Sequence, residues 1–154
     1  MCFLIITELH LIMKNAVTYA LLATAITFTG CTTYVGVDNP DNSGSMFSNI
    51  TGTLTTKYKA EPEVVFNAVK RAVDQQSDIM KRMGETQHNS EGQLFDTTVF
   101  ARAIGDLEVK INVTKIEDEK TKESYTQVTV KYGFFGNCEQ SQQLVSKISA
   151  NVRR

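Results

Sequence analysis

Two side chains in the second half of the sequence are of types that could do chemistry, the imidazole of His88 and the thiol of Cys138. His88 lies in the run Gln-His-Asn-Ser-Glu, with Glu85 and Glu91 close by in sequence. A catalytic base or a metal site needs several polar side chains held at a fixed spacing. One histidine with two nearby glutamates, without such a spacing, is more typical of a solvated turn. We therefore expect no catalytic residue, no bound metal and no cofactor, and we interpret the protein as a non-enzyme.

Cys138 is expected in the first turn of the last helix, where the helix dipole makes a thiol more reactive. In an oxidising compartment it would then favour an intermolecular disulfide. The alternative is a small, partly buried residue that packs under the loop 133–136, Gly-Phe-Phe-Gly. This loop lacks the lysine of a phosphate-binding loop. We interpret its glycines as the turn from strand to helix, and we expect one of its two phenylalanines to fill the core.

An apolar stretch occupies the amino terminus. Residues 1–30 contain only two charged side chains, Glu8 and Lys14, and the run 16–28 is free of charge. That run is too short for a membrane-spanning helix, which takes about 20 apolar residues. It fits the apolar region of a secretory signal peptide that starts at Met13, with residues 1–12 as an upstream extension. The alternative is a longer natural signal that begins at the first residue.

The stretch ends at residues 28–31, Phe-Thr-Gly-Cys, which resemble the bacterial lipobox. The resemblance implies that the signal peptide 1–30 is removed and that Cys31 becomes lipidated, with palmitate among its acyl chains. Two hydrophobic signals already give stable membrane anchoring. The alternative is an ordinary signal peptide with a chance cysteine. Because Thr32 follows, rather than aspartate, known sorting rules imply the outer membrane of the cell envelope rather than the inner one.

Composition limits the partners and the domain organisation. The chain has 16 Lys plus Arg against 17 Asp plus Glu, a net charge of −1, which excludes the basic footprint of a nucleic-acid-binding protein. Its three cysteines are too few for a disulfide scaffold. Residues 31–48 begin with the lipidated cysteine and are otherwise rich in Gly, Ser, Asn, Asp and Pro, so they are interpreted as a flexible tether with a reach of about 20–25 Å. Residues 49–154 are expected to form a single globular domain.

Hydrophobic periodicity predicts a long first helix in this domain. The helix begins at Pro62, and apolar residues continue at helical spacing as far as Met83, where Gly84 is a fitting stop. The threonine-rich segment before the helix is predicted to be a strand, with one face made by Ile50, Leu54 and Tyr58. Residues 85–89 are predicted to form a short polar strand. Alternation between apolar and polar residues within 93–134 predicts three further strands, joined in part by a hairpin at residues 105–106.

A second helix closes the chain, with Asn137 as its predicted cap. The predicted fold is therefore α+β, an antiparallel meander sheet packed against a long first helix and a C-terminal helix, with the other sheet face polar. The inner faces either form a solid core or enclose an apolar cavity. The residues that would line this cavity are Phe66, Val69, Val73, Val109, Ile111, Val130, Tyr132, Leu144 and Ile148.

Residues 31–36 and the ending 130–141, Val-Lys-Tyr-Gly-Phe-Phe-Gly-Asn-Cys-Glu-Gln-Ser, resemble a family of small bacterial envelope lipoproteins of unknown function. The chain is similar to virulence-determinant lipoproteins of Francisella, and the resemblance covers about residues 13–154. It implies a reduced form of the helix-grip fold of the birch-pollen allergen, a role in infection, and no catalytic residues. We expect a lipid-anchored module that binds an apolar small molecule or an envelope component. The alternative is a structural or host-interaction lipoprotein without a ligand.

Overall fold

The computed structural model describes residues 32–35, 42–88, 95–117 and 122–153. The predicted signal peptide and Cys31 lie outside the described residues, as does Glu91. Two helices and seven strands are present in the described part of the chain. In chain order they are β1 (Thr32–Val35), β2 (Asn42–Ser48), β3 (Thr53–Tyr58), α2 (Pro62–Asp74), β4 (Met80–Gln87), β5 (Asp96–Ala103), β6 (Leu107–Glu117), β7 (Ser124–Tyr132) and α3 (Cys138–Val152).

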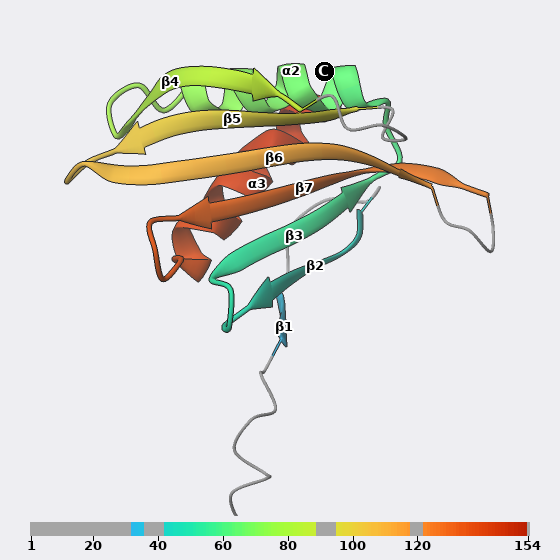
Figure 1. Ribbon diagram of the computed structural model, residues 1–154, viewed down its shortest axis with the longest axis horizontal. Helices are drawn as coiled ribbons and strands as arrows, with labels where there is room; N and C mark the ends of the chain where they lie inside the picture. Colours follow the sequence, from blue (N-terminus) through green and yellow to red (C-terminus); the bar gives the residue numbers. More distant parts are fainter. Residues whose placement is uncertain (1–31, 36–41, 89–94, 118–121, 154) are drawn as a thin grey trace, which may run out of the picture. The chain divides into compact units, whose positions relative to one another are not determined.

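The strands form one sheet in the order β1-β2-β3-β7-β6-β5-β4, and every neighbouring pair is antiparallel (Figure 1). Strands β4 to β7 follow one another as the predicted meander, and β3 joins the sheet beside β7. The prediction of an α+β fold with an antiparallel meander is therefore confirmed. Buried and more exposed side chains alternate along the central strand β7, which buries every second residue from Thr126 to Tyr132.

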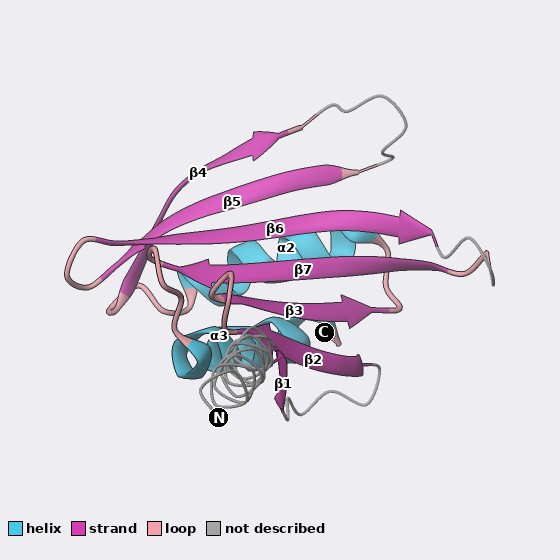
Figure 2. Ribbon diagram, turned by 60° about the horizontal axis from the view of Figure 1, so that its bottom comes forward, coloured by secondary structure: helices cyan, strands magenta, loops and turns pink. Residues whose placement is uncertain are grey.

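Both helices cover the same face of the sheet (Figure 2). Helix α2 has proline in its first turn and buries one stripe of apolar side chains, including Val65 and Val69. Helix α3 begins as predicted, because the side-chain oxygen of Asn137 accepts a hydrogen bond from the backbone N–H of Gln140 at 3.0 Å. The core lies between these helices and the inner sheet face.

The prediction of a long first helix is wrong, because α2 ends at Asp74. Residues 75–79 form a turn in which the carbonyl of Gln76 accepts the backbone N–H groups of Ile79 and Met80. The following segment is β4, whose backbone groups pair with β5. Ile79 and Met83 mimic a helical stripe but are exposed, so tertiary strand pairing decides the conformation here rather than burial of a helix face.

Three single-residue expectations of the sequence also need correction. Gly84 is no helix stop: it lies in β4 where the register to β5 shifts, which is the place of a bulge. Ile50 lies in the turn between β2 and β3 rather than in a strand, and 76% of its surface is exposed. Phe134 lies beyond the end of β7 and is exposed, as is Phe135, so neither phenylalanine fills the core.

The segment predicted to be a flexible tether carries strands. Residues 42–48 form β2, and Phe47 in this strand is only 5% exposed because its register opposite Leu54 of β3 places it against the core. The buried hydroxyl groups of Ser45 and Thr56 lie 2.8 Å apart and link the same two strands. Strand β1 then pairs with β2. The folded domain therefore begins before residue 49, because β3 would otherwise expose an unpaired strand edge.

Candidate functional site

The nine residues predicted to line a cavity are brought together, and they pack in one apolar cluster. Seven of them have no exposed surface: Val69, Val73, Val109, Ile111, Val130, Leu144 and Ile148. Tyr132 is 4% exposed, and burial raises the pKa of its phenol. Phe66 is half-buried at the rim of the cluster. It forms an edge-to-face pair with Phe95, with ring centroids 6.0 Å apart, and lines an open surface pocket of about 560 Å³ between α2 and strands β4 and β5.

The described side chains that the sequence offered for catalysis or metal binding do not form a cluster of ligands. His88 is exposed just after β4, and its Nε2 lies 3.3 Å from the hydroxyl of Thr98. Glu85 faces Lys70 and Arg82, at 3.9 Å from each cation. Within the described ranges, no group of three or more His, Cys, Asp or Glu side chains is placed to hold a metal ion. Cys138 is half-buried and packs against the core at the start of α3.

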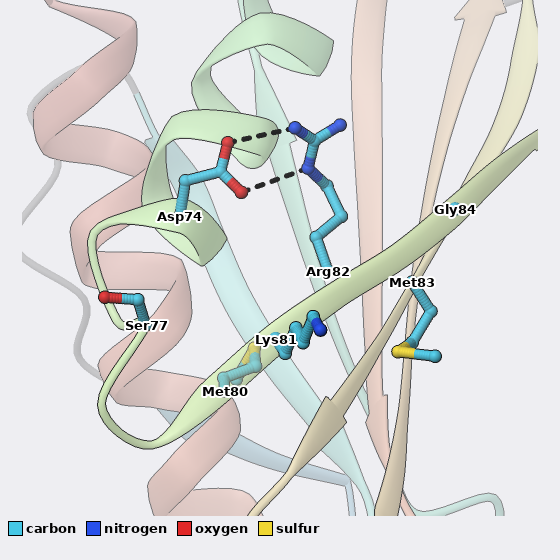
Figure 3. Close-up of a pocket in the computed structure, with 7 residues that line it drawn as sticks. All are labelled: Asp74, Ser77, Met80, Lys81, Arg82, Met83 and Gly84. Atoms are coloured by element: carbon cyan, nitrogen blue, oxygen red, sulfur yellow. Dashed lines mark hydrogen bonds and ion pairs between the residues drawn. The ribbon is translucent and has the colours of Figure 1, made fainter.

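A second surface pocket, of about 480 Å³, lies where the turn after α2 leads into β4 (Figure 3). Arg82 and Asp74 form a two-pronged ion pair in its wall. The Nε of Arg82 donates to Oδ1 of Asp74 at 3.0 Å, and the Nη2 of Arg82 donates to Oδ2 of Asp74 at 3.1 Å. This hydrogen-bonded carboxylate raises the pKa of Arg82. Because the guanidinium is already held by a carboxylate, we interpret this pair as the fastening of β4 onto the end of α2.

Among the residues whose burial the structure describes, the most exposed aromatic side chains belong to the loop between β7 and α3. Phe134 is 82% exposed and Phe135 is 86% exposed, and their rings meet edge to face with centroids 5.1 Å apart. The ammonium group of Lys131 lies 5.8 Å from the centre of the Phe134 ring. The sequence did contain a sign of this site. Two adjacent phenylalanines between two glycines break the alternation of apolar and polar residues, so a strand could bury only one of them. What the sequence could not show was that both rings point into solvent.

Glycines fix the conformation of this loop. Gly133 has a φ of +59°, and its N–H donates to the carbonyl of Glu108 at 2.7 Å. Gly136 has a φ of +79°, and its backbone lies directly against the backbone of Gly52, whose φ is +66°. Positive φ values are accessible to glycine at little cost. The loop is thus attached to β6 on one side and to the turn between β2 and β3 on the other.

Exposed apolar side chains are concentrated at the end of the sheet that carries this loop. The strand register places the turn 49–52, the turn 75–79, the hairpin loop 104–106 and the loop 133–137 at the same end, on the left of Figure 1. Among the described residues, eight large apolar side chains are exposed, and five of them lie in these loops: Ile50, Ile79, Ile104, Phe134 and Phe135. We call this region the aromatic end of the sheet.

A pocket of about 480 Å³ adjoins Phe134 at the aromatic end. It lies between the hairpin of β5 and β6 and the end of β7, and its lining residues are Gly105, Asp106, Leu107, Glu108, Lys110, Lys131, Gly133 and Phe134. Lys110 and Lys131 are direct partners across β6 and β7, and Lys110 forms an ion pair with Glu108 at 3.3 Å. The aromatic end therefore combines apolar tips with two lysines on the polar sheet face.

This fold and this surface define a small α+β protein in which the exposed apolar side chains of the described residues are mostly gathered in the loops at one sheet end. The chain belongs to the family described as protein of unknown function (DUF3568), which matches residues 13–151. No match to this chain was found among curated proteins. None of the helices in the described residues is long and apolar enough to cross a membrane.

Proposed function

We propose that this chain is a non-enzymatic, lipid-anchored protein of the bacterial cell envelope that binds another envelope component through the aromatic end of its sheet. Acylated Cys31 would hold it in a membrane, with the outer membrane favoured by the Thr32 that follows. The observation that carries the binding role is the exposed pair Phe134 and Phe135 on a loop fixed by glycines. The lipid anchor rests on the sequence of residues 28–31.

The exposure of two adjacent phenylalanines supports a contact surface on physical grounds. Burying one such side chain contributes about 1.5–3 kcal/mol, so a partner that covers both rings gains about 3–6 kcal/mol before the costs of association. Contiguous exposed apolar groups on soluble domains commonly mark such contacts. Because the loop is already fixed by its glycines, little further ordering of the backbone opposes the contact.

Packing of the core favours a surface contact over a small molecule held inside the domain. The nine side chains expected to line a cavity touch one another in one cluster, and seven of them have no exposed surface. The inner sheet face lies against α3, the terminal helix (Figure 2), and this arrangement supports the proposal of a reduced helix-grip fold. In such a fold the sheet would grip the helix itself rather than a ligand.

The lipid anchor is tested by replacing its thiol in the bacterium that makes the protein. Cys31→Ala should abolish the incorporation of labelled palmitate and move the protein from the membrane fraction to the soluble fraction. Cys138→Ala is the matched control, because it removes the only cysteine of the described residues and should leave labelling unchanged. Unchanged membrane association of the Cys31→Ala protein would contradict the proposal.

A further inference from the structure

The path of the chain into the sheet places the predicted anchor beside the aromatic end. Thr32, the first residue of β1, pairs with Ser48 of β2. Ser48 also pairs with Thr53 of β3, and Thr53 pairs with Lys131 of β7. These four residues form one row across β1, β2, β3 and β7. Three strand spacings of about 4.8 Å put the backbone of Thr32 roughly 14 Å from that of Lys131. Phe134 follows only three residues after Lys131.

Little chain separates the predicted lipid from this row. Cys31 directly precedes Thr32, and consecutive Cα atoms are about 3.8 Å apart. A flexible tether of residues 31–48 would have lifted the domain off the membrane, but strands β1 and β2 occupy most of that segment. A lipid on Cys31 would therefore hold the aromatic end, and not the opposite end of the sheet, at the bilayer surface.

The chemistry of the aromatic end suits the bilayer interface. Ile50, Phe134 and Phe135 are each more than three-quarters exposed, and they come from two loops that touch through Gly52 and Gly136. Apolar and aromatic side chains gain free energy in the boundary between headgroups and acyl chains. Lys131, beside Phe134, carries a positive charge that is complementary to anionic headgroups, whereas the charge of its partner Lys110 is already paired with Glu108.

We propose that Ile50, Phe134 and Phe135 insert into the lipid bilayer that holds the anchor, so that the sheet stands on the membrane with its aromatic end. This inference rests on the proposed function, names lipid as the envelope component that the aromatic end contacts, and fixes the orientation of the domain. The occupant that we propose for this surface is lipid. A second copy of the chain is the competing occupant, and the experiment distinguishes the two.

The absence of tryptophan from the sequence allows a single-tryptophan experiment. Phe135→Trp places a reporter at the aromatic end, just beyond the last residue of β7, and Tyr125→Trp places the matched control near the start of β7, roughly 20 Å away along the strand. The full acylated proteins are purified from membranes, their acylation is verified by mass, and they are reconstituted in vesicles of phosphatidylethanolamine with a minority of phosphatidylglycerol. In a second set of vesicles the acyl chains carry bromine, which quenches the fluorescence of a tryptophan only when its ring reaches the acyl chains.

The expected result is a blue-shifted emission of Phe135→Trp that brominated lipid quenches severalfold more strongly than the emission of Tyr125→Trp. Ile50→Trp is a second reporter of the same end and should behave like Phe135→Trp, which covers the case that one variant fails to fold by circular dichroism. Equal, weak quenching of both ends in the acylated protein would overturn the inference while leaving the anchor intact. A blue shift that appears without vesicles and depends on protein concentration would assign the surface to a second copy and also overturn it.

Failure of the anchor gives a different result. A chain whose mass shows no acylation contradicts the proposed function. The reporters can then be read on the unacylated full chain added to the same vesicles, where insertion of the aromatic end still predicts stronger quenching of Phe135→Trp than of Tyr125→Trp.

Discussion

Gly52 and Gly136 meet backbone to backbone at the aromatic end of the sheet. A Cβ atom added to Gly136 would overlap the carbonyl oxygen of Gly52, and one added to Gly52 would overlap the carbonyl oxygen of Phe135. Both glycines also have positive φ values. This contact joins the turn between β2 and β3 to the loop between β7 and α3. It thereby connects the two loops that carry Ile50, Phe134 and Phe135.

Gly136→Ala should therefore lower the free energy of unfolding by about 2–4 kcal/mol, since it adds a backbone overlap to the roughly 1–2 kcal/mol cost of a left-handed alanine. Gly105→Ala is the matched control, because Gly105 has a φ of +79° but nothing within 4 Å of an added Cβ. It should cost only the conformational part, about 1–2 kcal/mol. Urea denaturation of the two purified variants measures the difference, and equal losses would show that the contact between the two glycines contributes nothing.

Phe47 and Phe135 should respond in opposite ways to truncation. Phe47→Ala removes a side chain that is only 5% exposed and should destabilise the domain by about 3–5 kcal/mol. Phe135→Ala removes an 86% exposed ring and should change stability by less than about 0.5 kcal/mol. Thermal or urea unfolding checks both. A silent Phe47→Ala variant would mean that β2 is not part of the cooperative fold and would restore the prediction of a tether.

Alkaline pH should destabilise the fold through Tyr58. Its hydroxyl lies 3.0 Å from that of Ser149 in α3, and burial raises the pKa of the phenol from 10.0 to about 12, while the hydrogen bond with Ser149 acts in the opposite direction. Between these two pH values the unfolded chain has lost the proton and the folded chain retains it. Ionisation of Tyr58 should therefore leave the free energy of unfolding unchanged below pH 10. Above pH 10 the free energy of unfolding should fall by up to about 1.4 kcal/mol per pH unit.

Tyr58→Phe tests this origin of the pH dependence. At pH 8 the variant should lose about 1 kcal/mol or less, because the hydroxyl of Ser149 also donates to the carbonyl of Val145 at 2.9 Å and so keeps a partner. Urea midpoints measured between pH 8 and 11 should fall less steeply for the variant than for the unchanged protein. Some slope will remain, since burial also raises the pKa of Tyr132. Parallel curves for the two proteins would contradict the assignment to Tyr58.

Local signals were sufficient for much of the fold. Pro62 in the first turn of α2, the cap formed by Asn137 and the regular alternation along β7 are each set by residues close together in sequence, and each agrees with the prediction. The spacing of apolar residues gave a wrong end for α2, because the sequence does not show which apolar side chains are buried. Ile79 and Met83 look like a continuation of the α2 stripe, yet both are exposed and the segment from Met80 pairs with β5.

The sequence by itself determined the α+β class, the order of the meander, most of the apolar core and the glycine-flanked pair Phe134 and Phe135. Only the tertiary structure decided that both rings face solvent, that residues 42–48 add a strand beside β3, and that Thr32 and Lys131 lie in one row of the sheet. The physical reason is that strand pairing and the contact of Gly52 with Gly136 join segments distant in sequence. Periodicity within one segment carries no information about which neighbour will satisfy its backbone or cover its side chains.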